Sequence, residues 1–314
     1  MSKYLDPKVD LTFKKVFGEH PNLIQSLLNS LLPLPQGCYI ESLEYLSPEQ
    51  IPENPGKKFS IVDVKCKDNY NRYFIVEMQT YWNSAFFIRT LHNTTKIYSS
   101  QLYKSDEFKQ LKSVYALCIV NDNAFPQFAH TDEYIQEYYI INKHHPEDIR
   151  DAISMIFVEL PKYKPVTKGD KKLKDLWLQY FTEIDEKTVD VDPDLLNNPE
   201  TSIALEIVKR SAFTDAELAA YDKSKLDEIT ERSALSNARE EGLEKGREEG
   251  EKIGIEKGRE EGEKIGIEKG REEERSKAYQ EKLKMAKSLK HSGVAISIIS
   301  SATGLTVDEI EKIK

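Results

Sequence analysis

The most informative part of the chain is the segment Phe59-Ser-Ile-Val-Asp-Val-Lys-Cys-Lys-Asp-Asn-Tyr-Asn-Arg-Tyr-Phe-Ile-Val-Glu-Met-Gln79. Its two ends, 59–66 and 73–79, are rich in β-branched and aromatic residues, and a polar stretch that favours a turn separates them. Each end carries one acidic residue among apolar neighbours, Asp63 in the first and Glu77 in the second. The pattern predicts a β-hairpin with one carboxylate on each strand.

The two carboxylates are expected to face each other. Side chains alternate across a strand, so Glu77 shares one face with Ile75 and Gln79. A hairpin centred near Tyr70 places Asp63 directly across from Glu77. Opposed Cβ atoms in such a pair lie roughly 4.5–5.5 Å apart, where like charges repel. A half-buried pair of carboxylates is unfavourable unless a cation lies between them, so the spacing predicts a site for a divalent cation.

The hairpin resembles the active core of the PD-(D/E)XK nuclease superfamily, which has an acid on one strand and acid-x-Lys on the next. Here the second half reads Glu77-Met78-Gln79, with glutamine where most members have lysine. The glutamine form resembles the Rpn group of recombination-promoting nucleases, also called PD-(D/E)XK family transposases. The resemblance extends over most of the chain, through 10–18 (DLTFKKVFG), 27–32 (LLNSLL), 87–91 (FIRTL), 158–163 (VELPKY), 219–222 (AAYD) and the glycine-periodic tail after residue 240.

The resemblance implies a metal-dependent nuclease in which Asp63 and Glu77 bind the metal. Magnesium (Mg2+) suits an all-oxygen site with one or two carboxylates, and Mn2+ is a possible substitute. The carbonyl of Met78 could add a further oxygen ligand. Gln79 takes the place of the lysine that would orient or activate the attacking water. An amide can position a water but is a poor base and carries no charge, so the chemistry would rely more on the metal or on a substrate phosphate.

Further charged residues are candidates for the same site. Asp10 precedes a short helix expected at 11–17, and it is either a third catalytic acid or simply the N-cap of that helix. The cations expected near the site, and suited to phosphate contacts, are Lys14, Lys15, Arg89 and Lys96. Each of these cations also has the plainer interpretation of a solvated surface charge.

The two carboxylates have a structural interpretation as well. Asp63 can form an ion pair at the strand edge with Lys65 or Arg72, and Glu77 can pair with Arg89 on the following helix. Pairs of this kind would need no metal. The shared cross-strand position and the wider resemblance favour a metal site for the two residues taken together.

The composition constrains the partners only weakly. The 314 residues carry a formal net charge of −9, and 32% of them are charged, so the chain as a whole has no basic footprint for nucleic acid. Much of the acid lies in the C-terminal repeat, and an acidic tail can mask a local basic cleft. The charge therefore counts mildly against DNA binding without excluding it.

The compartment is expected to be the cytoplasm. The start of the chain has no apolar core of signal-peptide length, and no run approaches the ~18–20 apolar residues that span a bilayer, so no membrane partner is expected. The three cysteines, Cys38, Cys66 and Cys118, lack metal-type spacing and are expected to be reduced packing residues.

Hydrophobic patterns predict an α/β fold. Helices are expected at 11–17, 22–32 and 84–104, and strands beside the hairpin at 40–46, 114–120, 135–141 and 153–160. These elements predict a central mixed sheet flanked by helices, restriction-endonuclease-like as the resemblance implies, with an all-α C-terminal extension. Four parts are expected: a nuclease core at 1–165, a helical appendage at 166–236, a glycine-periodic arm at 237–278 and a small helical association module at 279–314.

The arm has a regular glycine pattern. Glycine recurs at every fourth position from 242 to 270, and a twelve-residue unit repeats at 246–257 and 258–269. Glu–Lys pairs four residues apart favour helix, whereas each glycine costs about 0.8–1.0 kcal/mol relative to alanine. A four-residue period exceeds the 3.6-residue turn, so the glycines wind around the axis and a conventional two-stranded coiled coil is not expected. The arm is either a charged spacer, helical or partly disordered, or a surface for self-association.

The last segment, 279–314, regains apolar periodicity. Short helices are expected at 295–302 and 307–313, joined by a turn at Gly304. Two short helices joined in this way resemble a helix-turn-helix. The second helix is acidic, which is unfavourable for reading a DNA groove, so a small oligomerising module is favoured over a DNA reader.

Together these features predict a Mg2+-dependent DNA endonuclease that forms a homo-oligomer through its C-terminal region. The resemblance implies a role in recombination, mobile-element biology or phage defence. One alternative is a catalytically inactive DNA-binding or self-assembling scaffold that retains the nuclease fold. A second alternative is a nuclease that acts on RNA.

Overall fold

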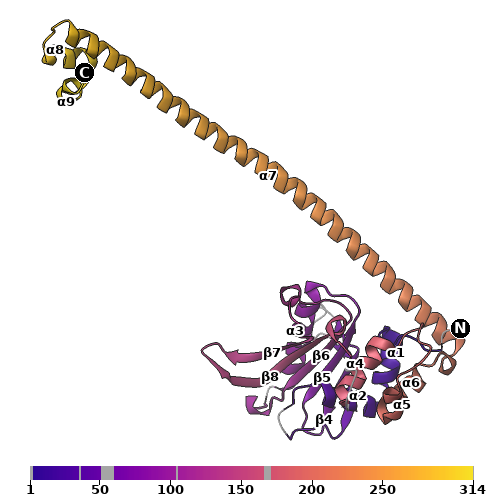
Figure 1. The fold of residues 1–314 in the computed structure, drawn as a ribbon. Helices are drawn as coiled ribbons and strands as arrows, with labels where there is room; N and C mark the ends of the chain where they lie inside the picture. The colour runs from indigo at the N-terminus through magenta and orange to yellow at the C-terminus, as the bar shows by residue number, and fades with distance from the viewer. Residues whose placement is uncertain (1–2, 35–36, 51–59, 104, 166–170, 314) are drawn as a thin grey trace. The chain divides into compact units, whose positions relative to one another are not determined.

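The computed structural model describes residues 3–34, 37–50, 60–103, 105–165 and 171–313. These residues form two compact units that divide between Arg232 and Ser233 (Figure 1). Within the described ranges, no helix combines the length and the apolar character needed to cross a membrane. The finer four-part division expected from the sequence stays a prediction.

The larger unit is built around a six-stranded mixed sheet with the order β1-β4-β5-β6-β8-β7. Its strands are β1 (Leu43–Tyr45), β4 (Val64–Asp68), β5 (Tyr73–Gln79), β6 (Val114–Val120), β7 (Ile135–Asn142) and β8 (His145–Glu159). Strands β5, β6 and β8 are parallel, whereas β1, β4 and β7 run antiparallel to their neighbours. A separate ladder joins β2 (Glu49–Gln50) to β3 (Ser60–Ile61).

Helices cover both faces of the sheet (Figure 1). One face packs against α3 (Ser84–Ser99). The other face packs against α1 (Asp10–Phe13), η1 (Lys14–Gly18), α2 (Pro21–Leu31), α4 (Leu173–Glu183), α5 (Pro193–Asn197) and α6 (Pro199–Ile207). Because β6 is covered on both sides, all seven residues of its apolar sequence VYALCIV are buried. The expected α/β fold, a mixed sheet flanked by helices, is confirmed.

The helices that follow the sheet share its core. Trp177 of α4 is fully buried, lies 5.4 Å from the ring centroid of Phe17, and donates a hydrogen bond from Nε1 to Ser26 Oγ at 3.0 Å. Leu195 and Leu205, on α5 and α6, belong to the same buried cluster as the sheet residues. The segment after the last strand therefore stabilises the sheet from one side.

Several element bounds differ from the sequence expectation, and the larger differences are as follows. The first run of the predicted hairpin is split into β3 and β4 by a bend at Asp63, and residue 59 lies outside the described residues. Strand β8 begins eight residues earlier than 153 because it continues into a long hairpin with β7. Helix α3 ends at Ser99 instead of residue 104. The expected helix at 11–17 is a short α1 followed by the π-helical turn η1.

The smaller unit is all-helical, as expected for the C-terminal extension. It contains the part of α7 (Asp215–His291) that follows residue 232, together with α8 (Ile296–Thr303) and α9 (Val307–Glu311). Its core is formed by Ala286, Ile299, Leu305 and Ile310. Gly304 ends α8 in the left-handed conformation, with φ of 70°, which glycine adopts without strain.

Residues 242–270 lie in the middle of α7 and are helical and exposed. A Cβ added at any of the eight glycines of this stretch would meet no atom within 4 Å. The helix is therefore continuous here without any close approach that requires glycine.

The shared core predicts unequal effects for two adjacent leucines of α5. Leu195 is fully buried in the cluster that also contains the sheet residues, whereas Leu196 is 48% exposed. We expect Leu195→Ala to reduce the free energy of unfolding by roughly 2–5 kcal/mol. The matched variant Leu196→Ala should change it by no more than about 0.5 kcal/mol. Urea denaturation followed by circular dichroism measures both, and equal effects would show that α5 does not share the core of the sheet.

Candidate active site

Asp63 and Glu77 flank the last rung of the β4–β5 ladder. That rung pairs Val64 with Val76, so continuing the register by one residue on each strand brings Asp63 opposite Glu77. The chain bends at Asp63: Val62 packs in the cluster on the α3 face, whereas Val64 packs in the cluster on the opposite face. Strict alternation would have placed both valines on one face. The bend therefore ends the ladder at the position of the two carboxylates.

The carboxylate of Asp63 is held by the backbone of β5. The N–H of Met78 donates a hydrogen bond to Asp63 Oδ2 at 2.8 Å. In an extended strand the N–H and C=O of one residue point to the same edge, so the carbonyl of Met78 also points toward the Asp63 side. It lies beyond the final rung of the ladder, where no β4 residue pairs with it. The Met78 carbonyl oxygen is thus expected on the same side as Asp63, where it could serve as a metal ligand.

Glu77 lies between β5 and helix α3 and is only 4% exposed. Asn93 of α3 donates from Nδ2 to Glu77 Oε1 at 3.3 Å, and Arg89 Nη2 lies 3.6 Å from Glu77 Oε2. Arg89 and Asn93 are four residues apart, so they share one face of the helix. The structural pairing of Glu77 with Arg89 considered from the sequence is therefore present, together with the carboxylate pair.

The pKa values of both carboxyl groups are raised above their usual range. Desolvation is the main cause that raises the pKa of Asp63 to about 6, and it raises the pKa of Glu77 to about 7. The charge of Asp63 is the next largest cause at Glu77, in agreement with their facing positions beyond the last rung of the ladder. The positive charge of Arg89 lowers both pKa values, but by less than burial raises them. A bound cation would relieve this unfavourable charge.

Gln79 is tied into a short chain of polar contacts. Its Nε2 donates to the backbone carbonyl of Tyr81 at 2.8 Å, and Arg89 Nη2 donates to Gln79 Oε1 at 3.0 Å. The guanidinium of Arg89 therefore lies beside both Gln79 and Glu77. The neutral amide and the cation together occupy the end of β5 nearest the carboxylates.

Two N-terminal residues also lie near Asp63. Lys14 Nζ is 3.9 Å from Asp63 Oδ1 and 2.7 Å from Asp10 Oδ1. The charge of Asp10 raises the pKa of Asp63, so Asp10 is close enough to influence the pair. The alternative role of Asp10 as an N-cap is wrong, because α1 begins at Asp10, its N-cap is Val9, and it has no side-chain cap.

The other two predicted cations are Lys15 and Lys96. Lys15 pairs with Glu217 and stacks over the ring of Phe213, with Nζ 4.2 Å from the ring centroid, so it is not brought to the carboxylates. Lys96 is in the last turn of α3. Burial lowers the pKa of Lys65, and the charge of Lys96 lowers it further. The pairing of Asp63 with Arg72 is absent, because Arg72 bonds to Asp68 instead at 2.7 Å.

The oxygen ligands available here suit Mg2+, which does not need a site made entirely of protein ligands. Within the described residues, no group of three or more His, Cys, Asp or Glu side chains is arranged to hold a metal. Two carboxylates and one carbonyl suit Mg2+, which keeps several ligands for water and phosphate. Asn93 Oδ1 is buried beside Glu77 without a hydrogen-bond partner, which adds an unsatisfied acceptor to the site. The ladder register and the hydrogen bond from Met78 to Asp63 bring Asp63, Glu77 and Met78 together, and their role as metal ligands stays a prediction.

Asn93 is the residue that the sequence analysis missed. It is fully buried and polar, and it follows Arg89 by one helical turn. A buried asparagine needs partners for its amide, so it marks a polar site within a core. The available sequence signal was its i, i+4 spacing from Arg89, which places both residues on the face that meets β5.

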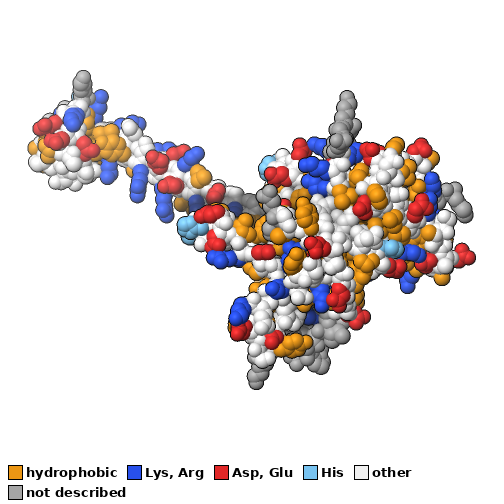
Figure 2. Space-filling view, turned by 90° about the horizontal axis from the view of Figure 1, so that it is seen from below, with side chains coloured by type: hydrophobic (Ala, Val, Ile, Leu, Met, Phe, Trp, Pro, Cys, Tyr) orange, Lys and Arg blue, Asp and Glu red, His pale blue; other side chains and the backbone are white. Residues whose placement is uncertain are grey.

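The charges at the surface are mixed. On the face shown in Figure 2, basic and acidic side chains are interspersed over the described residues. This distribution agrees with the net charge of −9 and with the absence of an overall basic footprint in the composition. Phosphate contacts would have to come from local cations such as Lys14 and Arg89.

The raised pKa values predict that the free energy of unfolding decreases as the pH rises. A carboxyl group whose pKa is higher in the folded state than in the unfolded state binds more protons when folded. The stability of the fold therefore falls as the pH rises between the two pKa values. For Glu77 these values are 4.5 and about 7. In EDTA, we expect Glu77→Gln to be more stable than the wild type at pH 8, by roughly 2–3 kcal/mol, and to match it near pH 4. Thermal denaturation across this range measures the difference.

The exposed carboxylate of Glu137 on β7 supplies the control. Glu137→Gln should leave the pH profile of stability unchanged. A Glu77→Gln variant that is less stable than the wild type at pH 8 would contradict the uncompensated charge of the pair.

Comparisons with known proteins agree with the geometry. The model of the PD-(D/E)XK nuclease family transposases matches residues 7–238, which include the hairpin, α3 and the first turns of α7. No curated protein and no solved structure matches the chain. The family match covers well over half of the 314 residues and confirms the resemblance seen in the sequence. The chain thus belongs to the PD-(D/E)XK nuclease family transposases, a nuclease family linked to transposition.

Proposed function

We propose that the protein is a Mg2+-dependent DNA endonuclease that acts in the cytoplasm, in recombination or in the biology of mobile elements. The observation that carries the proposal is that half-buried Asp63 and buried Glu77 face each other at the end of the β4–β5 ladder, where desolvation raises the pKa of both carboxyl groups. The family supports a nuclease linked to transposition. DNA is the substrate that such a family implies, and an all-oxygen donor set favours magnesium.

Each residue of the site has a distinct role in this proposal. Asp63 and Glu77 bind the cation through their carboxylates, and the Met78 carbonyl adds an oxygen. The bound metal would supply Lewis-acid stabilisation of the negative charge on the phosphate. Asn93 and the Met78 N–H hold the carboxylates in position through hydrogen bonds of 3.3 and 2.8 Å. Catalysis then depends on these hydrogen bonds, because they orient the carboxylates before the substrate binds.

Gln79 and the local cations would act on the water and the phosphate. The amide of Gln79 has no charge and cannot take a proton at neutral pH, so its role is to position a water. Arg89 lies between Gln79 and Glu77 and can donate to a phosphate oxygen, as can Lys14 from the Asp63 side. Asp10 would act through Lys14, to which it is bonded, and would not contact the reacting atoms. These two cations approach the carboxylates from different elements.

The proposal predicts metal-dependent cleavage that requires both carboxylates. Purified protein with Mg2+ or Mn2+ should cleave plasmid DNA. Asp63→Asn and Glu77→Gln should each reduce the rate by at least about 100-fold, because loss of a metal ligand removes several kcal/mol of charge stabilisation. Gel electrophoresis of plasmid and of a matched RNA measures both activity and substrate choice. EDTA should abolish cleavage in the wild type.

Glu137→Gln, at the exposed carboxylate on β7, provides the matched control and should retain full activity. Cleavage that persists in both active-site variants would refute the site. If no divalent metal supports cleavage of DNA or RNA, the inactive scaffold is the better description, and preferential cleavage of the RNA would replace DNA as the substrate.

We further infer that the C-terminal region mediates self-association with a second copy of the chain. The arm exposes large apolar side chains at about half of their area or more: Leu243, Ile253, Ile255, Ile265 and Ile267. It carries both signs of charge in each twelve-residue repeat, so two copies of the arm offer each other complementary charges. Exposed apolar side chains in such number favour association over isolated solvation.

A truncated chain tests this inference. Multi-angle light scattering should give a mass above 36.2 kDa for the full chain and the mass of a monomer for a chain that ends after Ser236. The larger compact unit ends at Arg232, so this truncation leaves it whole. An unchanged number of subunits after truncation would remove the proposed role of the arm.

A further inference from the structure

The first turns of α7 are bonded to the larger unit along one face of the helix. The residues that make these contacts are Glu217, Tyr221, Lys225, Glu228 and Arg232. They follow one another at intervals of three or four residues, which is the spacing of a single helical face. We call these five residues the anchor face. All five belong to the larger compact unit.

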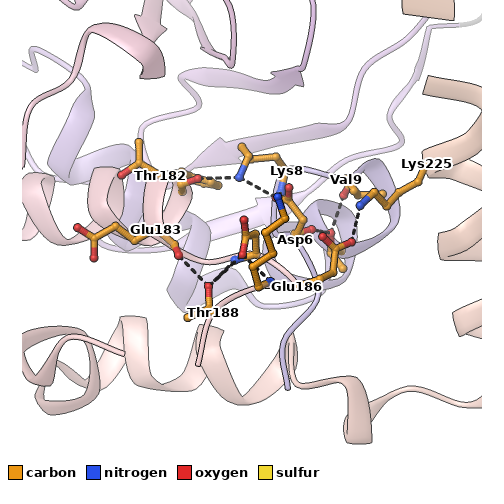
Figure 3. Close-up of polar contacts among 12 residues, drawn as sticks. Asp6, Lys8, Val9, Thr182, Glu183, Glu186, Thr188 and Lys225 are labelled. Carbon is orange, nitrogen blue, oxygen red and sulfur yellow. Dashed lines mark hydrogen bonds and ion pairs between the residues drawn. The ribbon is translucent and has the colours of Figure 1, made fainter. Parts of the chain in front are cut away.

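The anchor face begins at the N-terminal segment and the loop after α4. Lys225 Nζ bonds to Glu186 Oε1 at 2.5 Å, and the hydroxyl of Tyr221 accepts a hydrogen bond from the N–H of Asp6 at 3.0 Å. Figure 3 shows Lys225 directed at Glu186. Lys8 in turn donates to the carbonyl of Phe181 at 2.9 Å. This network fixes the first part of the helix to the core.

The anchor face ends at the loop that follows β5. The hydroxyl of Tyr81 donates to Glu228 Oε1 at 3.1 Å, and the guanidinium of Arg232 lies 5.1 Å from the centroid of the Tyr81 ring. A phenol that is both hydrogen-bonded and covered by a cation is held at two points. Tyr81 is thus fixed by α7 from one side.

The backbone of Tyr81 continues into the candidate active site. Its carbonyl accepts the hydrogen bond from Gln79 Nε2, and Gln79 Oε1 accepts from Arg89, which lies beside Glu77. The side-chain amide of a glutamine can be turned over to exchange its oxygen and nitrogen. The Tyr81 carbonyl accepts only from the NH2 group, so it directs the oxygen of Gln79 toward Arg89. The position of Tyr81 therefore sets which atom of Gln79 faces the site.

We propose that the turn of α7 from Glu228 to Arg232 is a positioning element of the active site, which acts through Tyr81 on the Gln79 amide and on Arg89. The inference rests on the proposed function and names residues that help to arrange it. It agrees with the extent of the family match, which reaches residue 238 and so includes both α7 residues. Tyr81, Glu228 and Arg232 are positioning residues, because each acts through Gln79 and none contacts the carboxylates.

The simpler alternative is that Tyr81 only packs α7 onto the larger unit. In that case, substitutions would lower stability without changing the orientation of Gln79. Removal of the hydrogen bond between the Tyr81 hydroxyl and Glu228 distinguishes the two roles. A packing role predicts a change in stability alone, whereas a positioning role predicts a change in the orientation of Gln79. Glu228 is suited to the test because glutamine keeps an oxygen that can accept from Tyr81, whereas alanine does not.

The kinetic experiment uses the full chain with plasmid DNA and Mg2+. Glu228→Ala and Tyr81→Phe should lower kcat by about tenfold with KM unchanged, as expected for the loss of one orienting hydrogen bond. Glu228→Gln should restore most of kcat. Glu231→Ala, at an exposed position on the same turn of α7, is the control and should match the wild type. Equal losses in Glu228→Gln and Glu228→Ala would overturn the proposal.

A double-mutant cycle separates positioning from packing. Once Gln79 is replaced in Gln79→Ala, the further change Glu228→Ala should cause no additional loss of kcat, because the group that it positions is gone. Additive losses in the double variant would show that Glu228 does not act through Gln79, and would refute the proposed chain of contacts.

A readout that does not need activity distinguishes this inference from the proposed function. The side-chain NH2 signals of Gln79 in a 15N-glutamine-labelled protein, assigned by Gln79→Asn, should shift in Glu228→Ala and stay in place in Glu228→Gln and Glu231→Ala. If the wild type cleaves nothing, the proposed function fails while this shift still supports the positioning of Gln79. Unchanged Gln79 signals in Glu228→Ala would overturn the inference whether or not the protein cleaves DNA.

Discussion

Repulsion between the buried carboxylate of Glu77 and the half-buried carboxylate of Asp63 is the constraint around which the site is organised. Asp63 and Glu77 occupy the point where the β4–β5 ladder ends, and the charge of Asp63 adds to the burial that raises the pKa of Glu77. Lys14 Nζ lies 3.9 Å from Asp63 Oδ1, and Arg89 Nη2 lies 3.6 Å from Glu77 Oε2. A sheet keeps such a pair only because the surrounding core fixes both strands, and a cation between the carboxylates would then be strongly favoured.

The surrounding structure supplies that rigidity from separate parts of the chain. The parallel pairing of β5 with β6 holds Glu77 in register with Cys118, and α3 places Asn93 and Arg89 over it. The N-terminal turn contributes Lys14 on the side of Asp63. The site thus depends on contacts between segments that are distant in sequence.

Gln79 shows how a neutral residue is used where most members of the superfamily have lysine. Its amide cannot supply charge, and the cation at that end of β5 is Arg89, which comes from α3. The amide instead links Arg89 to the carbonyl of Tyr81, and Tyr81 is held by the anchor face of α7. The first turns of α7 are in this way part of the domain that carries the site, consistent with a family match that ends at residue 238.

The sequence by itself determined the hairpin, its centre near Tyr70 and the facing of Asp63 and Glu77, because strand alternation and turn chemistry are local properties. It also determined the helical C-terminal extension. Only the tertiary structure decided that the first strand breaks at Asp63, that Lys15 pairs with Glu217, that Asn93 donates to Glu77, and that the Tyr81 carbonyl accepts from Gln79. These features depend on which distant segments pack together, and the physical reason is that a buried polar group takes its partner from whatever the fold brings within hydrogen-bond reach.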